Sequence, residues 1–396
     1  MQSTGDKQRS LFMLMLVQLS TGFSMGIIAP ILGLFVRSQG LSMAQIGLIG
    51  TASMLGWFIW EPIMGVFADR FNKRLMLAGA LFFTTLLNGL YPLANSFLFF
   101  AVLEFTKTSI MSAYSIPVKA LAAELLPTQD RGRVYGRYMT VISFGGMVSP
   151  LIGGFVSENM GRSMPFYLAA GVGLLGILAV FSVKYDETNH DYGKVDHTGN
   201  IRKLLTGSVL AIFSVRGLFF FNAGFTGSFL SIFLNESPHF MATESQIGAF
   251  FTILRLAGAA SRSFIGDICD RIGNRLIISG SLAGMGLSYI GLMYLSGLIP
   301  LYLIGVLQGI CQASADTSMM LRLISVMPKE RSGLTMGLYS EAENIGGIIS
   351  TPSVGYLYQN MGANSSIWLI ALVMLANSGY SYFVIRENPQ KSETGS

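Results

Sequence analysis

Residues 65–74 read GVFADRFNKR, and residues 266–275, which lie 201 positions later, read GDICDRIGNR. The two stretches share an initial Gly, a central Asp-Arg pair and a final Arg. Other matches follow at the same offset, because the triplet Gln-Ile-Gly at 45–47 recurs at 246–248, and Gly136, Gly145, Gly146 and Gly154 recur at 337, 346, 347 and 355. Self-similarity at one fixed offset marks a duplicated structural unit. The sequence therefore predicts two similar halves.

The apolar residues of both halves are gathered in long runs. Of the 396 residues, 51% are hydrophobic and 12% are charged, whereas an average soluble protein has about 25% charged residues. A helix needs about 20 apolar residues to cross a bilayer. The sequence predicts an all-α membrane protein with twelve transmembrane helices in two six-helix halves, at 11–36, 43–68, 75–95, 97–126, 132–157, 164–184, 205–233, 243–268, 276–296, 301–327, 332–358 and 365–385.

The polar stretch 185–203 separates the predicted halves, which are residues 1–184 and 204–396. Lys and Arg residues gather in short loops on one side of the predicted spans, and cytoplasmic loops hold such a basic excess. Both termini and the linker are therefore predicted to be cytoplasmic, in a multi-pass protein of the cell membrane. The formal net charge of +5 is interpreted as this topology signal and not as a nucleic-acid surface.

Enzymatic and ATP-driven functions find little support in the sequence. It contains no GxxxxGK[ST] phosphate loop and no cluster of metal ligands, and its three histidines, His190, His197 and His239, fall in predicted loops. A phosphate loop of that pattern would be needed to bind ATP in the usual way. We therefore expect no catalytic residue, no metal and no cofactor.

The stretch 65–74 resembles the loop that follows the second helix in the major facilitator superfamily. Parallel repeats of six helices are the architecture of that superfamily. The resemblance implies a gate in which this loop latches onto the start of the eleventh helix, near 332–336. Asn72 replaces the second Gly of the pattern, which is tolerable because Asn also adopts positive φ. The resemblance assigns the gating motif to Gly65, Asp69, Arg70, Arg74, Gly266, Asp270, Arg271 and Arg275.

Two more predicted helices bear on the resemblance. In helix 132–157, Gly145, Pro150, Gly153 and Gly154 resemble the superfamily's antiporter motif, which marks exporters that exchange substrate for protons. Ordinary close packing through small residues is the alternative. Helix 97–126 departs from the drug-exporter pattern, because Glu104 occupies the position where many such antiporters carry Arg.

Charged residues within the predicted spans are the candidates for the transport site. Each costs at least about 2.5–3.5 kcal/mol inside a bilayer, so it should face a cavity or a partner. Depth along the helices predicts the ion pairs Glu61–Lys119 and Arg262–Asp316, and i,i+3 spacing predicts a local Glu104–Lys107 pair. Asp316 ranks first for proton coupling, followed by Glu341 and Glu104. The full set is Glu61, Glu104, Lys107, Lys119, Arg255, Arg262, Asp316, Arg322, Glu341 and Glu343.

The predicted function is secondary active transport by alternating access, through a monomer in the lipid bilayer. The antiporter-like motif favours proton-coupled export of a small amphipathic or drug-like molecule. The alternative is uptake of an organic anion or another small metabolite by a symporter or uniporter. The buried basic residues and Glu104 favour this alternative.

Overall fold

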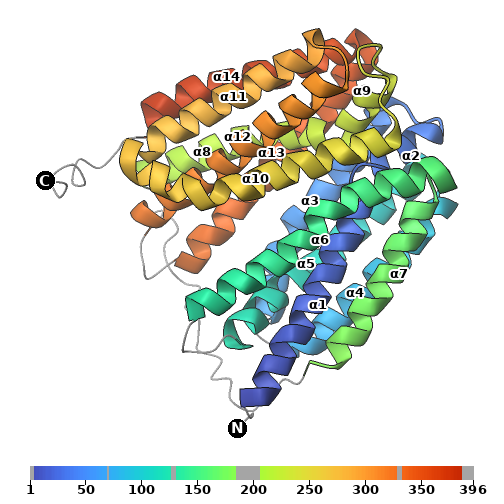
Figure 1. The fold of residues 1–396 in the computed structure, drawn as a ribbon, viewed down its shortest axis with the longest axis vertical. Coiled ribbons are helices and arrows are strands. Elements are labelled where there is room, and N and C mark those ends of the chain that lie inside the picture. Colours follow the sequence, from blue (N-terminus) through green and yellow to red (C-terminus); the bar gives the residue numbers. More distant parts are fainter. Residues whose placement is uncertain (1–3, 69–70, 126–130, 184–205, 328–331, 386–396) are drawn as a thin grey trace, which may run out of the picture. The chain divides into compact units, whose positions relative to one another are not determined.

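The computed structural model describes residues 4–68, 71–125, 131–183, 206–327 and 332–385 (Figure 1). These residues form helices and no β-strand. In chain order the elements are α1 Thr4–Ile28, α2 Leu32–Ser38, α3 Met43–Ala68, α4 Lys73–Leu90, the 3-10 turn η1 Tyr91–Leu93, α5 Phe97–Leu125, α6 Arg131–Met160, α7 Met164–Phe181, α8 Gly207–Ser228, α9 Leu230–Glu236, α10 Glu244–Ile272, α11 Asn274–Tyr294, α12 Leu298–Val326, α13 Ser332–Met361 and α14 Ala363–Val384.

The twelve predicted helices are present, and two of them are divided. The first is interrupted between α1 and α2 at residues 29–31, where Pro30 has no backbone N–H to donate and its ring disfavours a continuous helix. The seventh is interrupted at Phe229, between α8 and α9, with no proline beside the break. The first and seventh helices are therefore each a long helix followed by a short one, where the sequence predicted a continuous helix.

Nine helices of the described chain are long and apolar enough to cross a membrane by length and composition alone. The predicted spans that fall outside this set are α5, α10 and α13. Each of these helices has charged residues along its length, including Glu104 and Lys107 on α5, Arg255 and Arg262 on α10, and Glu341 and Glu343 on α13. These three helices carry part of the candidate site.

The chain folds into two compact units. Unit 1 comprises residues 1–195, 227–236 and 241–252, and unit 2 comprises residues 196–226, 237–240 and 253–396. Unit 1 thus includes α9 and the first turns of α10 besides α1 to α7. The predicted linker 185–203 lies outside the described residues.

Unit 1 is built on close helix pairs. Helix α3 packs against α5, α1 against α6 and α7, and α4 against α7 (Figure 1). At Gly56 of α3 an added Cβ would lie 2.7 Å from the carbonyl oxygen of Phe105 on α5. Small residues permit such close backbone approach between membrane helices.

Unit 2 has a similar construction. Helix α11 packs against α12 and α14, and α13 packs against α14. Helices α10 and α12 approach closely, because a Cβ added to Gly258 would lie 2.9 Å from the carbonyl oxygen of Gly309. This contact holds α10 and α12 together near the charged residues described next.

Candidate functional site

Arg216 of α8 is the most deeply buried basic residue of the candidate site in unit 2. Its residue is only 5% exposed. The guanidinium carbon lies 4.5 Å from the ring centroid of Phe220 and 4.5 Å from that of Tyr339 on α13. A guanidinium over an aromatic face is attracted by the ring quadrupole, most strongly when it is shielded from water. The two rings therefore fix the cation in place.

Two carboxylates from different helices bind this one guanidinium. Nε of Arg216 donates to Oε1 of Glu343 on α13 at 2.8 Å, and Nη2 donates to the same oxygen. Nη1 donates to Oδ1 of Asp316 on α12. The planar fork of arginine allows such simultaneous binding, which the single ammonium of lysine cannot reproduce.

Asp316 also faces a second cation. Its Oδ2 lies 3.7 Å from Nη2 of Arg262 on α10. We call Arg216, Arg262, Asp316, Tyr339 and Glu343 the Arg216 cluster. Its two guanidinium groups and two carboxylates carry no net formal charge when all are ionised.

Solvent exposure rises across the Arg216 cluster. The side chain of Arg216 is 6% exposed, that of Glu343 26%, that of Asp316 37% and that of Arg262 57%. Asp316 therefore touches both the buried guanidinium and the accessible part of the cluster.

The structure places Glu343 at Arg216, although Glu341 ranked higher by sequence. Glu341 instead accepts a hydrogen bond from Nδ2 of Asn344 at 3.4 Å. Residues two apart on an α-helix point about 200° away from each other, so only one of the two glutamates can reach a given neighbour. The sequence predicted this exclusion but favoured the other glutamate.

A second buried group lies in unit 1, and we call it the Glu104 cluster: Tyr91, Glu104 and Lys107. Nζ of Lys107 lies 2.6 Å from Oε1 of Glu104, and the hydroxyl of Tyr91 donates to the same oxygen. Lys107 also lies 4.6 Å from the centroid of the Tyr91 ring. Ser53 of α3 hydrogen-bonds to Glu104 as well. The cluster therefore joins α3, η1 and α5 around one carboxylate.

The predicted ion pairs have mixed outcomes. The structure contains the Arg262–Asp316 and Glu104–Lys107 pairs. It does not contain the Glu61–Lys119 pair, because Lys119 is exposed and no ion pair joins these two described residues. Depth along a helix predicted the level of each residue but not the direction in which its side chain points.

Arg216 is the residue that the sequence prediction missed. It lies in the predicted span 205–233 and is the only charged residue of α8. A single charge within an otherwise apolar span is a signal of a buried site. The other predicted basic residues lie where expected along their helices, Arg255 on α10 and Arg322 on α12, and Nη1 of Arg322 donates to Oγ of Ser325 at 3.2 Å. Among the described residues, no group of His, Cys, Asp and Glu is arranged to hold a metal ion.

The first copy of the predicted gating motif is partly described, since Asp69 and Arg70 lie outside the described residues. Asn72 has a φ of −57° and its Oδ1 accepts from the N–H of Leu75 at 2.9 Å. The expectation of positive φ is therefore wrong for Asn72, which instead caps the N-terminus of α4. Arg74 donates to the carbonyl oxygen of Phe181 on α7.

The second copy of the motif differs in its contacts. Gly273 has a φ of +88°, a conformation that suits Gly. The guanidinium of Arg275 lies 3.8 Å from the ring centroid of Tyr382, and Asp270 and Arg271 are exposed. A Cβ added at Gly266 would meet no atom within 4 Å, and one at Gly65 would meet only Ile116 at 3.7 Å. Among the described residues, no close helix contact requires either glycine.

The antiporter-like motif of α6, which comprises Gly145, Pro150, Gly153 and Gly154, packs tightly within unit 1. A Cβ added to Gly145 of α6 would lie 2.7 Å from the carbonyl oxygen of Leu19 on α1, and one added to Gly153 would collide with that of Ile27. A Cβ added to Gly154 would collide with the carbonyl oxygen of Glu244, and one added to Gly248 would collide with the carbonyl oxygen of Pro150. The small residues of this motif therefore have a direct packing role.

A sequence profile of the Major Facilitator Superfamily matches residues 14–298 and 212–396. The chain belongs to the Major Facilitator Superfamily. Proteins of this superfamily are membrane transporters, and the helical fold of the described residues agrees with that membership. The two ion-pair clusters are therefore candidate parts of a transport pathway.

Several relatives within the superfamily are named for drug resistance. An uncharacterised MFS-type transporter of Methanocaldococcus jannaschii is 26% identical over 96% of this chain and 99% of its own length. Multidrug resistance protein 2 of Bacillus subtilis is 23% identical over 96% of each chain. The quinolone resistance protein NorA of Staphylococcus aureus is 26% identical over 41% of each chain.

Solved structures of superfamily transporters share the fold. A bacterial homologue of the human lysosomal transporter Spinster, in an inward-facing and unoccupied conformation, superposes with a TM-score of 0.78 and 13% identity over 98% of this chain and 100% of its own. The nucleoside transporter NupG superposes with a TM-score of 0.74 and 14% identity over 95% and 97% of the two chains. At these identities the likeness concerns the fold alone.

Proposed function

We propose that this protein is a proton-coupled exporter of small amphipathic or drug-like molecules, working by alternating access. The Arg216 cluster carries the proposal, because carboxylates from two different helices, Asp316 on α12 and Glu343 on α13, meet one buried guanidinium there. The drug-resistance names of the relatives support the substrate class. The small-residue motif of α6 supports exchange of substrate for protons through its resemblance to the antiporter motif.

Coupling follows from the three helices that meet at Arg216. While α8 and α12 stay close, the two guanidinium groups stabilise the ionised form of Asp316. A movement that separates Asp316 from these cations removes that stabilisation and favours proton uptake. Return of the cations expels the proton. Proton binding is thereby linked to helix position, and Asp316 is the first candidate because it is the more exposed carboxylate of the cluster.

Other predicted features belong to the same proposal. The Asp-Arg loop at 69–70 and its second copy at 270–271 act as the gate. The protein works as a monomer in the cell membrane, with both termini cytoplasmic. Residues Arg255, Glu341 and the Glu104 cluster contribute to the cavity surface or to its support.

The test is transport in proteoliposomes with and without a pH gradient, using ethidium and a fluoroquinolone as probes. Asp316→Asn is expected to abolish transport driven by the gradient. Exchange of labelled for unlabelled probe at equal pH should survive, because exchange needs no net proton movement. Glu236→Gln is the matched control, since Glu236 is an exposed carboxylate of α9 outside both the Arg216 cluster and the gating motif.

Two results would contradict the proposal. If the unmodified protein moves probes with no pH dependence and no accompanying proton flux, the carrier is a uniporter or uses another ion. If Asp316→Asn retains full gradient-driven transport, coupling resides in another carboxylate, and Glu343→Gln is the next variant.

Uptake of an organic anion is the alternative, and two of the buried basic residues, Lys107 and Arg216, offer it little support. An anion-binding site needs a buried cation with spare charge. Lys107 is paired with Glu104, and Arg216 is shared by two carboxylates. The charges of these two buried basic residues are therefore already compensated within the protein.

A further inference from the structure

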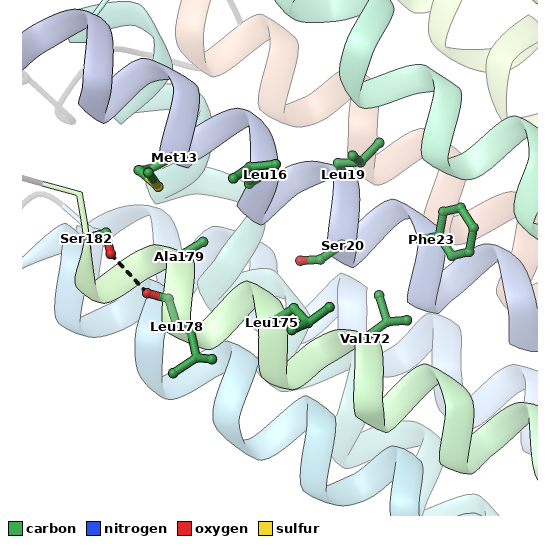
Figure 2. Close-up of a pocket in the computed structure, with 10 residues that line it drawn as sticks. All are labelled: Met13, Leu16, Leu19, Ser20, Phe23, Val172, Leu175, Leu178, Ala179 and Ser182. Atoms are coloured by element: carbon green, nitrogen blue, oxygen red, sulfur yellow. Dashed lines mark hydrogen bonds between the residues drawn. The ribbon is translucent and has the colours of Figure 1, made fainter.

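A groove runs between α1 and α7 in unit 1, with a cavity volume of about 500 Å³. Five residues of α1 between Met13 and Phe23 line one side, and five residues of α7 and its end, between Val172 and Ser182, line the other (Figure 2). The only side-chain hydroxyls in this lining belong to Ser20 and Ser182, and they donate to the carbonyl oxygens of Val17 and Leu178. The groove therefore presents a hydrocarbon surface.

The α7 side of the groove faces hydrocarbon when the protein is in a bilayer. Helix α7 has no charged residue. Leu175 and Leu178 line the groove and are 63% and 67% exposed. Exposed leucines of a membrane-spanning helix with no charge have lipid chains as their natural neighbours.

The length of the groove suits one lipid acyl chain. Ten residue steps separate Met13 from Phe23, which at 1.5 Å per residue amounts to about 15 Å along α1. One leaflet contributes about 15 Å to a hydrocarbon core of about 30 Å. The groove thus spans about the thickness of one leaflet.

Two arginines lie at the same end of the groove. Arg74 of α4 donates to the carbonyl oxygen of Phe181, the residue before Ser182. Arg9 is exposed and lies one helical turn before Met13 on α1. The guanidinium fork binds phosphate oxygens well. This end is predicted to be cytoplasmic, where the membrane surface carries anionic lipids.

We propose that this groove is a binding site for an anionic phospholipid, with one acyl chain between α1 and α7 and the phosphate at Arg9 and Arg74. The site is separate from the Arg216 cluster and does not depend on the proposed transport function. Its occupant would join α1, α4 and α7 at one membrane surface.

Native mass spectrometry of the full-length protein tests the proposal. Delipidated protein receives dioleoylphosphatidylglycerol and dioleoylphosphatidylcholine in equal amounts. We expect the unmodified protein to retain one molecule of phosphatidylglycerol. The Leu175→Trp variant should not retain this lipid, because the larger side chain fills the groove. Leu174→Trp is the matched control, because Leu174 is 55% exposed on the same helix but does not line the groove. Unchanged melting temperatures verify that both variants are folded.

Charge variants test the headgroup assignment. Arg9→Gln and Arg74→Gln should each reduce the preference for phosphatidylglycerol about fivefold, as expected for one basic residue near a membrane surface. Arg37→Gln, on α2, is the control and should leave the preference unchanged.

Three outcomes would overturn the assignment. Equal lipid retention by Leu175→Trp and the unmodified protein would place the lipid elsewhere. If Leu175→Trp loses both lipids while the arginine variants leave the lipid preference unchanged, the groove binds acyl chains without selecting a headgroup. Binding of ethidium in place of lipid, lost in Leu175→Trp, would make the groove a substrate entry site.

Discussion

At the scale of single residues, Arg216 shows how a buried cation depends on everything around it. Its guanidinium is held between two aromatic rings and binds Asp316 and Glu343. Loss of one member of a buried ion pair is costly, because the remaining charge stays in a low-dielectric site without compensation. The two carboxylates would then also repel each other.

Arg216→Gln should lower the free energy of unfolding by about 3–5 kcal/mol. Adding Glu343→Gln should restore part of this loss, because the double variant leaves one carboxylate fewer without a cation. Unfolding in increasing concentrations of a denaturing detergent, monitored by circular dichroism, measures the free energies of unfolding of both variants.

The matched control for Arg216→Gln is Arg37→Gln. Arg37 pairs with Glu236 at 3.1 Å, but the two side chains are 39% and 43% exposed. An exposed pair contributes at most about 1 kcal/mol. Equal losses in the two arginine variants would show that burial of the Arg216 pairs contributes nothing to stability.

The sequence predicted which types of charged residue lie within the helices and their positions along each helix. The Glu104–Lys107 and Arg262–Asp316 pairs follow from spacing and from the positions of residues along their helices. Glu61–Lys119 failed, because the helix rotation that decides whether two side chains meet depends on packing of the whole unit. Arg216 could have been predicted as a site residue from the sequence, since a lone charge in an apolar span such as 205–233 is rare.

At the scale of elements, the sequence predicted the helices well and their interruptions poorly. The 3.6-residue helix and the length of a bilayer span constrain each long apolar run. The division of the first helix at Pro30 had a sequence signal, whereas the division at Phe229 has no proline beside it. The second division shows that the short helices α2 and α9 are a feature of both copies of the repeat.

The pairing of α1 with α6 gives a test at the same scale. Gly153→Ala should lower the free energy of unfolding by about 1–3 kcal/mol, because its new methyl group would collide with the backbone of Ile27. Gly146→Ala on the same helix is the control. Its Cβ would lie 4.0 Å from the nearest atom, the carbonyl oxygen of Gly22, so it should be neutral or stabilise by up to about 1 kcal/mol. A neutral Gly153→Ala variant would refute the close-packing role of the motif.

At the scale of the whole molecule, orientation rests on the one-sided distribution of Lys and Arg. Cysteines introduced singly at Ser3, Asn189 and Ser392 should not react with impermeant thiol reagents in intact cells. A cysteine at Gln39, which is exposed beyond α2, should react. The native Cys269 and Cys311 are buried and provide a low background. Labelling from outside at any of the first three positions would reverse the proposed topology.

The ion pairs also constrain how the ribosome and translocon can build the protein. Lys107 follows Glu104 by three residues, so α5 enters the membrane with its counter-charge already present. Arg216 is synthesised 100 residues before Asp316 and 127 residues before Glu343. In that interval α8 carries an arginine that costs about 2.5–3.5 kcal/mol in lipid.

Nascent chains truncated before and after α12 would reveal this delay through glycosylation sites placed beside α8. We expect incomplete integration of α8 in the shorter chain and full integration in the longer one, and complete integration in both would refute the delay. The Glu104–Lys107 pair of the N-terminal half thus forms within a single helix. The pairs of Arg216 in the C-terminal half form only after α12 and α13 have left the ribosome.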